Sequence, residues 1–499
     1  MDPQLNHRIV MCNGRSEQTD GEYVLYWMAF NRRTENNFSL QFAVDKAIAL
    51  NKPLLILETL WLDYPNASAR FHKFVLDGMK DNERAFRKSP VTYLGYVERE
   101  AQARKTLLQK LASNACLVVT DAFPCEHMES LLKELNKSTS VAVLAVDSNG
   151  ILPVMVPEKA FTTAYSFRRY LQKNLHEHLL CFPRITPCSG QVLPKAPDVS
   201  SLGLTAWGCV DGNSSIISAN LKSLPINHAV PPATVSGGRR AGLEILKEFV
   251  SFKLRNYSSQ RNSIEECSAS GLSPYLHFGH ISSHDIFTAV MQKVGWTPAC
   301  LHHDNVSGKR LGWWGLDEDV ESFLDQLITW REIGFNAAYK LNNFDKYESL
   351  PVWAKTTLAD HELDLRTHLY QIHELENAET HDEIWNAAQR QLVKEGRMHN
   401  YLRMLWGKKV LEWSRSSQEA LERLIYLNNK YALDGNNPNS YSGIFWCFGR
   451  YDRAWGPERP IFGKVRYMSS KNTNRKLRLA DYLSRYKSLE NSLLCSTGK

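Results

Sequence analysis

The sequence predicts an N-terminal doubly wound, Rossmann-like α/β domain with a parallel sheet, followed by a C-terminal all-helical domain. In the first third of the chain, short apolar runs alternate with stretches of helical periodicity, as they do in parallel sheets covered by helices. From Gly237 onward, the periodicity is almost entirely helical. The chain has 499 residues, which is more than one ordinary hydrophobic core requires.

Five apolar runs are expected to form the strands of the α/β domain. They are Tyr23–Ala29, Pro53–Glu58, Val91–Tyr96, Cys116–Thr120 and Val141–Val146. Stretches of helical periodicity lie between them, as in Asn37–Leu50 and Glu100–Ser113. The domain has neither a GxGxxG segment after its first strand nor a GxxxxGK[ST] segment. Dinucleotide or P-loop chemistry is therefore not expected in this domain.

Composition divides the chain into five segments. Residues 1–20 are expected to form an N-terminal tail, 21–160 the α/β domain, 161–235 a linker rich in Pro, Ser and Gly, 236–487 the helical domain, and 488–499 a C-terminal tail. The main helices expected after residue 235 are Arg239–Phe252, Ser283–Lys293, Asp317–Tyr339, His381–Glu395, Met398–Trp413 and Ser417–Tyr431.

Several functional classes are not supported by the sequence. No run of eighteen apolar residues and no signal-peptide pattern occurs, so an intracellular protein without a membrane span is expected. The ten cysteines contain no CxxC pair, which argues against a zinc site and against a disulfide framework. The net charge of +7 permits a polyanionic partner without requiring one.

A basic strip from Gly463 to Leu479 is more informative than the net charge. It contains six cationic residues and no acidic residue. Such a strip is either a solvated surface or a phosphate-contacting one, and the sequence alone leaves both possibilities open.

Tryptophan is concentrated in the helical half, which contains ten of the thirteen tryptophans after residue 290. Trp406 and Trp413 are seven residues apart, so they share one helix face about 10 Å apart along the axis. Trp385 lies on the preceding expected helix. Core packing is the ordinary explanation for two aromatic residues at this spacing.

Four segments of the helical half resemble the photolyase and cryptochrome family, and in detail its class II branch, which acts on cyclobutane pyrimidine dimers. They are SASGLSPYLHFGHIS from Ser268, WREIGFNAAY from Trp330, the stretch from His381 to Trp413, and SGIFWCFGRYDRAWGPERPIFGKVRYMS from Ser442. The resemblance extends from Tyr23 to Tyr486. It implies a light-dependent lyase in which reduced FAD gives an electron to a dimer flipped out of UV-damaged DNA.

By this resemblance, the first segment holds the FAD diphosphate, whereas its hydroxyl-rich helix start would otherwise indicate a simple N-cap. An ion pair between Arg403 and Asp434 lies against the flavin ring, where its fixed positive charge favours the anionic hydroquinone. Asn428 faces flavin N5, a place for which Asn439 is the weaker candidate. The cofactor-binding residues implied by the resemblance are Tyr257, Ser270, Leu272, Ser273, Asn400, Arg403 and Asp434.

The resemblance also assigns a relay and a lesion pocket. Trp406, Trp385 and Trp413 carry electrons to the flavin, with Trp406 nearest to it and Trp413 outermost. Glu332 contacts the pyrimidine carbonyls, although on sequence alone it indicates only a helix-surface residue. The lesion- and DNA-binding residues implied are Asn336, Trp446, Arg453, Trp455, Lys464 and Arg466.

Two details depart from the class II pattern. The segment WCFGRYDRAW is one residue shorter than the class II WSIGGxHDxxW, which puts the dimer contacts before Trp455 in doubt. Trp330 stands where many class II members have arginine.

Some expectations from the resemblance leave alternatives open. It implies an antenna pigment of the 8-hydroxydeazaflavin type in the α/β domain, although this domain could merely brace the helical one. A monomer is expected, cytoplasmic in a bacterium or nuclear in a eukaryote. A cryptochrome-like photoreceptor is the main alternative function, and a (6–4) photolyase and a flavin-free DNA-binding protein are the others.

Overall fold

The computed structural model describes residues 3–195, 202, 204, 220–265 and 268–487. By their internal contacts, the residues form two compact units that interleave along the chain. The first unit comprises Met1–Lys159, Leu171–Val250 and Gly271–Val306, and the second comprises Ala160–Tyr170, Ser251–Ser270 and Ser307–Lys499. Residues from the expected helical domain thus contribute to both units. The functional domain limits stay predictions, and the expected tail at 488–499 and much of the linker lie outside the described residues.

The first unit is built on a six-stranded sheet with the order β1-β6-β5-β2-β3-β4. Five parallel strands confirm the expected doubly wound sheet, and each coincides with one expected apolar run to within a few residues. They are β2 (Tyr23–Met28), β3 (Leu54–Leu60), β4 (Thr92–Val97), β5 (Ala115–Asp121) and β6 (Ala142–Val146). The edge strand β1 (Ile9–Met11) pairs antiparallel with β6 and lies within the expected N-terminal tail. Three residues are too few for a periodicity to predict a strand.

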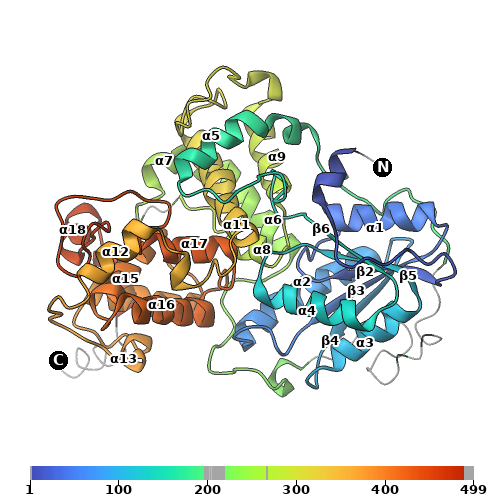
Figure 1. The fold of residues 1–499 in the computed structure, drawn as a ribbon, viewed down its shortest axis with the longest axis horizontal. Helices are drawn as coiled ribbons and strands as arrows, with labels where there is room; N and C mark the ends of the chain where they lie inside the picture. Colours follow the sequence, from blue (N-terminus) through green and yellow to red (C-terminus); the bar gives the residue numbers. More distant parts are fainter. Residues whose placement is uncertain (1–2, 196–201, 203, 205–219, 266–267, 488–499) are drawn as a thin grey trace, which may run out of the picture. The chain divides into compact units, whose positions relative to one another are not determined.

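Helices cover both faces of this sheet (Figure 1). The helices between strands are α1 (Phe38–Ala49), α2 (Ala69–Phe86), α3 (Ala103–Ser113) and α4 (Glu126–Ser138). The other α-helices of the unit are α6 (Arg239–Glu248), α8 (Ser273–His277) and α9 (Ser283–Val294). Every residue of β2, β3 and β5 is buried, which explains why these strands appear in the sequence as nearly continuous apolar runs.

The carboxylate of Asp121 ends β5 and organises the loop that follows β2. Its Oδ2 accepts hydrogen bonds from the backbone N–H groups of Ala29 (2.9 Å), Phe30 (2.8 Å) and Asn31 (2.9 Å). Its Oδ1 accepts from the Tyr26 hydroxyl at 2.9 Å. In nucleotide-binding α/β folds, the backbone at this turn faces a phosphate group of the ligand. Here these N–H groups donate to the carboxylate of Asp121 instead. This agrees with the absence of a GxGxxG motif after the first strand of the domain.

The second unit is helical, and its described part contains no β-strand. The expected helix Asp317–Tyr339 consists of α10 (Glu318–Leu324), a π-helical stretch (Asp325–Trp330) and α11 (Arg331–Lys340). The remaining helices, of which α5 continues into the first unit, are α5 (Ala164–Asn174), α7 (Tyr257–Gln260), α12 (Val352–Asp360), α13 (Ile372–Glu376), α14 (Glu383–Glu395), α15 (Asn400–Glu412), α16 (Ser417–Tyr431), α17 (Pro438–Trp446), α18 (Ser470–Lys476) and α19 (Ala480–Arg485).

Helices α11 and α17 approach each other closely because of a glycine. A Cβ atom at Gly334 would lie 2.6 Å from the Ser442 hydroxyl and 2.8 Å from the Pro438 carbonyl oxygen. The close approach therefore requires glycine at this position. It ties the helix that carries Glu332 to the helix that ends at Trp446.

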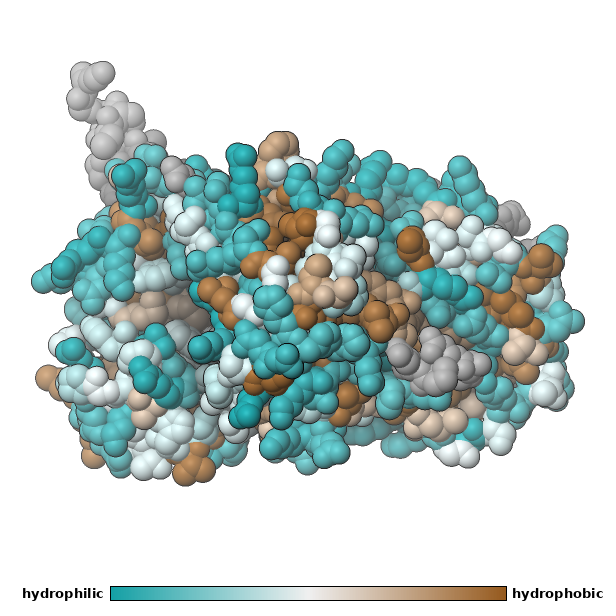
Figure 2. Space-filling model, turned by 90° about the horizontal axis from the view of Figure 1, so that it is seen from above, coloured by the Kyte–Doolittle hydropathy of each residue, from teal (hydrophilic) through white to brown (hydrophobic). Residues whose placement is uncertain are grey.

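Among the described residues, no helix is both long and apolar enough to span a bilayer. The face shown in Figure 2 is mostly hydrophilic, with apolar side chains gathered in small patches.

The Asp121 carboxylate predicts a large stability effect in the first unit. Replacing it in Asp121→Ala leaves three buried backbone N–H groups without their acceptor, so the free energy of unfolding should fall by about 3 kcal/mol or more. Denaturant unfolding of the full chain measures this loss. The exposed Asp20→Ala is the control, with a change within about 0.5 kcal/mol. Equal stabilities of the two variants would contradict the role of Asp121.

Candidate functional site

Three buried tryptophans form a continuous stack in the second unit. The ring centroids of Trp385 and Trp406 are 6.3 Å apart, and their planes differ by 9°. The Trp385 ring also contacts Trp413 edge to face, with 5.6 Å between centroids. All three side chains are at most 2% exposed. Trp385 therefore lies between the other two in space, although it comes first in the sequence.

Hydrogen bonds hold two of these rings in place. The Trp385 indole N–H donates to the Trp406 carbonyl oxygen at 3.1 Å, and the Trp406 indole N–H donates to Gln389 Oε1 at 3.0 Å. Helix α14 begins at the N-cap Asp382, whose carboxylate accepts from the Trp385 N–H. Because these indole N–H groups are satisfied inside the core, the rings have fixed orientations.

Trp413, expected to be the outermost residue of the series, is itself buried. Its ring contacts those of Tyr370 and the exposed His381, each with 5.3 Å between centroids. The Tyr370 hydroxyl lies 2.6 Å from His381 Nδ1. Burial and the neighbouring His368 lower the pKa of His381. The stack thus reaches solvent through two residues to which the sequence assigned no role in the relay, although His381 was expected to begin a helix that in the structure starts at Glu383.

A cavity of about 500 Å³ lies in the same unit. Four of the predicted site residues line it, namely Asn400, Trp446, Trp455 and Arg466. This volume falls within the usual range of small-molecule sites, about 300–1,000 Å³. The structure therefore brings part of the predicted lesion pocket and one predicted flavin residue to a common space. Lys476 of the expected basic strip also lines the cavity, as do Tyr401, Met404 and Arg459, which the sequence did not predict.

Arg466 connects the two tryptophan walls of this cavity. Its guanidinium carbon lies 3.9 Å from the ring centroid of Trp455 and 5.4 Å from that of Trp446. Asp452 holds the guanidinium in a bidentate pair, with N–O distances of 2.8 and 3.2 Å. Asp452 also accepts from the Trp455 indole N–H at 3.2 Å. One carboxylate therefore positions both the cation and the second wall.

Electrostatics at Asp452 favour its charged form. Burial alone would raise its pKa, but hydrogen bonds from Arg466, the Arg453 N–H and Trp455 outweigh that effect and lower the pKa below its usual value. The side chain of Arg453 is exposed and lies over the outer wall, 4.5 Å from the Trp455 ring centroid. Asp452 is thus ionised at neutral pH and anchors the wall as a charge-assisted acceptor.

A second cation contacts the inner wall. Lys408 is completely buried, and its Nζ lies 5.2 Å from the Trp446 ring centroid. It donates to the Cys447 carbonyl oxygen at 2.6 Å, just beyond the end of α17. Burial lowers the pKa of Lys408 to about 8. The cavity thus combines two indole walls with two cations at their rings, Lys408 and Arg466, of which Arg466 is paired with Asp452.

The segment Asp452–Met468 forms the cavity wall and is tied to the end of α12. The Ile461 N–H donates to Asp364 at 2.8 Å. His361 bridges two carboxylates, with 2.6 Å to Asp364 and 3.3 Å to Glu458. The hydrogen bond to Asp364, followed by that to Glu458, raises the pKa of His361.

The other predicted flavin residues lie apart from the cavity lining. Arg403 Nη2 is 3.3 Å from Asp434 Oδ1, so the expected ion pair is present. The buried Asn428 donates to Asn429 Oδ1 (3.0 Å) and Ser440 Oγ (2.8 Å).

The predicted diphosphate residues divide between the units, and their joint role stays a prediction. Tyr257 and Ser270 belong to the second unit. Leu272 and Ser273, at the start of α8, belong to the first.

The remaining predicted lesion residues have other surroundings. Glu332 and Asn336 lie buried on α11 and do not line the cavity. Asn336 Oδ1 accepts from the Phe161 N–H at 3.0 Å. Lys464, within the segment Asp452–Met468, is exposed and pairs with Glu458 at 3.2 Å.

The donor set of the second unit fits a flavin. The Arg403 guanidinium, held by Asp434, supplies a fixed positive charge, and Asn400 and Asn428 supply amide groups. The buried tryptophan stack continues from the same helix, since Trp406 is the residue three positions after Arg403. Among the described residues, no group of acidic, histidine or cysteine side chains could hold a metal ion.

Comparison with known proteins identifies the fold. A bacterial class III photolyase from Agrobacterium tumefaciens superposes with a TM-score of 0.63 at 16% identity, over 93% of this chain and 86% of that one. The chain is thus a protein of the photolyase fold. No family model matches it.

Sequence comparison identifies the family. The chain is 32% identical over 485 residues to the deoxyribodipyrimidine photo-lyase of Methanothermobacter thermautotrophicus, which covers 97% of this chain and 98% of that one. The photo-lyase of Arabidopsis thaliana is also 32% identical, over 95% of this chain and 90% of its own. That of Potorous tridactylus is 30% identical, over 93% and 81%. The chain belongs to the deoxyribodipyrimidine photo-lyase family.

The His361 bridge predicts a pH-dependent stability. Because its pKa is raised in the folded chain, its stabilisation is complete below the unfolded value of about 6.5 and is lost as pH rises through the raised pKa. The difference in unfolding free energy between wild type and His361→Asn should therefore be largest below about pH 6.5 and shrink as the pH rises above that value. Denaturant titrations measure it, with the exposed His373→Asn as control. A difference independent of pH would contradict the bridge.

Proposed function

We propose that this chain is a class II cyclobutane pyrimidine dimer photolyase that repairs UV-damaged DNA in light. The observation that carries the proposal is the cavity between Trp446 and Trp455, bridged by Arg466, in the same unit as the tryptophan stack. Such a cavity offers stacking faces and positive charge to a flat, electron-accepting group. The relatives reported above are all named photo-lyases, which favours repair over a cryptochrome-like photoreceptor role.

FAD is the cofactor that this family implies. When bound in its reduced, anionic form, FAD supplies an electron on absorbing light. Arg403 would hold that negative charge, and Asp434 would keep the guanidinium in place. The residues proposed to bind FAD are Tyr257, Ser270, Leu272, Ser273, Asn400, Arg403, Asn428 and Asp434.

The cavity walls are proposed to receive the flipped-out dimer. The pyrimidine rings would stack on Trp446 and Trp455, which are both half-buried and so expose part of each ring. Arg466 would attract the negative charge that the dimer gains when it accepts an electron. Splitting then breaks the two bonds between the pyrimidines and returns the electron, so the net reaction needs no further reactant.

The DNA backbone would lie along the basic strip. Lys464 and Arg453 are exposed beside the cavity, and Lys476 of α18 lines it. Neutralising phosphates with such side chains releases counterions and makes affinity dependent on salt. This arrangement supports the phosphate-contacting interpretation of the strip.

Glu332 is proposed to hydrogen-bond the dimer carbonyls, with Asn336 as a neighbouring residue. Both lie on α11, which packs tightly on α17 through Gly334, and α17 ends at Trp446. The helix that carries the glutamate is therefore fixed relative to the inner wall of the cavity. A hydrogen bond to the charged dimer would stabilise it during ring opening.

The tryptophan stack is proposed to keep the cofactor reduced, with electrons passing from Trp413 through Trp385 to Trp406. We further propose a monomeric intracellular protein, cytoplasmic in a bacterium or nuclear in a eukaryote. The antenna pigment of the 8-hydroxydeazaflavin type that the resemblance implies would belong to the α/β unit, and the repair chemistry above does not require it.

A light-dependent repair assay tests the proposed function. Reduced protein is incubated with an oligonucleotide that contains one thymine dimer, in near-UV light and in darkness. Conversion of the dimer to two thymines in light alone is expected. If the reduced, FAD-loaded protein leaves the dimer intact both in near-UV light and in darkness, the proposed function is wrong.

Trp406→Phe should block light-driven reduction of bound oxidised FAD, yet leave repair by chemically reduced protein close to wild type. The reason is that the stack recharges the cofactor, whereas repair uses an electron already present. Absorption spectra during illumination measure the reduction. Trp353→Phe, outside the stack, is the control and should photoreduce normally. Normal photoreduction in Trp406→Phe would show that the stack is not the pathway.

Glu332→Ala should lower the rate of dimer ring opening by about 10- to 150-fold, because hydrogen bonds to charged groups contribute about 1.5–3 kcal/mol. Dimer binding in the dark should change little, because the bond strengthens only after the dimer is charged. Repair yield per absorbed photon and dark affinity are measured together, and Glu332→Gln should recover part of the yield. A variant with weakened binding but full yield would contradict this role.

A further inference from the structure

Topology indicates where the α/β unit would bind a ligand. In open, doubly wound sheets, ligands bind outside the carboxyl ends of the strands, at the point where the strand order reverses. The order β1-β6-β5-β2-β3-β4 puts this switch point between β2 and β5. A pigment held by this unit would be expected in the crevice formed by the residues that follow these two strands.

Aromatic side chains of the chain itself fill this crevice. Phe30 follows β2 and Phe123 follows β5, and their rings are stacked with 4.2 Å between centroids and 4° between planes. Trp61, directly after β3, contacts the Phe30 ring edge to face at 5.6 Å. All three side chains are buried. The two stacked rings thus occupy the switch point where a planar ligand would lie.

The backbone donors of the crevice are also occupied. The N–H groups of Ala29, Phe30 and Asn31 all donate to Asp121, as described above. A ligand carbonyl or phosphate would have to displace a buried carboxylate that makes these bonds. Removing an acceptor from buried donors costs about 1–3 kcal/mol for each group left unpaired.

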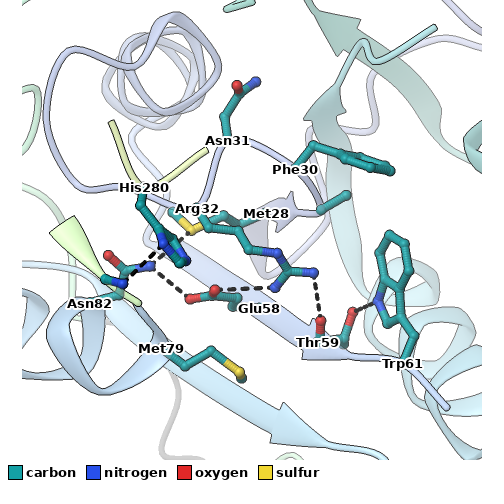
Figure 3. A network of polar contacts seen from close by, with 12 residues as sticks. Met28, Phe30, Asn31, Arg32, Glu58, Thr59, Trp61, Met79, Asn82 and His280 are labelled. Atoms are coloured by element: carbon teal, nitrogen blue, oxygen red, sulfur yellow. Dashed lines mark hydrogen bonds and ion pairs between the residues drawn. The ribbon is translucent and has the colours of Figure 1, made fainter. Parts of the chain in front are cut away.

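Two cationic side chains contact the Trp61 ring and hold it in its orientation. The guanidinium groups of Arg32 and Arg104 each lie 5.5 Å from its ring centroid. The Trp61 indole N–H donates to the Thr59 hydroxyl. Figure 3 shows Arg32 between Glu58 and Thr59, with the Trp61 ring beside them.

The supporting ion pair is itself buried and fully bonded. Arg32 donates to Glu58 at 3.1 Å, and Glu58 also accepts from Asn82 (2.9 Å) and from the Tyr93 hydroxyl (2.6 Å). Moving Trp61 would disturb this network, and a broken buried pair is strongly destabilising. The filled crevice is therefore a rigid feature of the unit.

The cavity next to these rings, on the β3 side of Phe30, measures about 20 Å³ and is lined by residues that include Phe30, Trp61, Tyr64 and His277. This is room for roughly one water molecule, for which about 10–15 Å³ suffices. It is far below the roughly 300 Å³ at the lower end of ligand pockets. A tricyclic deazaflavin or flavin does not fit this cavity, and the stacked Phe30 and Phe123 rings fill the switch point beside it.

We propose that the crevice at the switch point of the α/β unit binds no antenna pigment, because Phe30, Phe123 and Trp61 fill the place of a planar chromophore. The unit is then a scaffold, and bound FAD alone absorbs the light used in repair. This last point rests on the proposed function, but pigment binding is measured without any repair assay. A failure of the proposed repair function can therefore be told apart from a failure of the proposal that the crevice binds no pigment.

Titration of the full-length chain with pigments tests the proposal. The probes are 8-hydroxy-5-deazaflavin and FMN, and uptake is followed by absorption after gel filtration. The wild type should retain neither pigment in addition to FAD. The double variant Phe30→Ala/Phe123→Ala, which removes the stacked rings, should bind at least one probe about tenfold or more tightly than wild type, a gain of about 1.4 kcal/mol or more.

Phe86→Ala is the matched control, because it removes a buried ring of the same unit that stacks on Tyr93 instead. It should bind no pigment. Stoichiometric uptake of either pigment by the wild type would overturn the proposal, and this result does not depend on whether the double variant folds. A folded double variant that binds no better than Phe86→Ala would show that the two rings are not what closes the crevice.

Discussion

The ion pair between Asp452 and Arg466 is the interaction on which the candidate site depends. Arg466 can contact both tryptophan walls only because a bidentate carboxylate holds its guanidinium between them. Without Asp452, two cations, Arg466 and the buried Lys408, would lie near Trp446 with no adjacent negative charge. Asp452 also fixes Trp455 through its indole N–H. The positions of Arg466 and of the second tryptophan wall thus follow from one side chain.

The two units use buried charge in opposite ways. In the first unit, Asp121 and the Arg32–Glu58 pair satisfy donors within the chain and, together with packed rings, close the crevice of the sheet. In the second unit, Asp452 positions Arg466 and Trp455 beside a cavity of about 500 Å³. Both arrangements need a carboxylate that is fully hydrogen-bonded. The difference explains why a fold with two possible sites is proposed here to use only one.

The sequence predicted the strands and most helices because their signals are local. The five parallel strands are short apolar runs, and α14 and α16 show clear helical periodicity. The two-residue ion pair of Arg403 and Asp434 was predictable only from family resemblance, since thirty-one positions separate the partners. Periodicity missed β1 because it has only three residues.

Other features of the site depend on tertiary contacts without a local signal. Tyr370 and His381 became part of the tryptophan series only through the packing of a loop against Trp413. Asp452 lies in a loop, where no sequence periodicity indicates the role of a carboxylate. In the structure it nevertheless anchors the cavity wall through Arg466. The filled crevice could not be predicted either, because Phe30 and Phe123 are distant in sequence and meet only in the folded sheet.

The most direct test of the account is whether the tryptophan-walled cavity selects the lesion. Dark equilibrium binding of a duplex with one thymine dimer and of the undamaged duplex is compared for wild type and Trp446→Ala. Because stacking contributes about 1–3 kcal/mol per base, the variant should lose about 5- to 150-fold in dimer affinity. Its affinity for undamaged DNA should be unchanged. A variant that keeps the full preference for the dimer would contradict the assignment of this cavity.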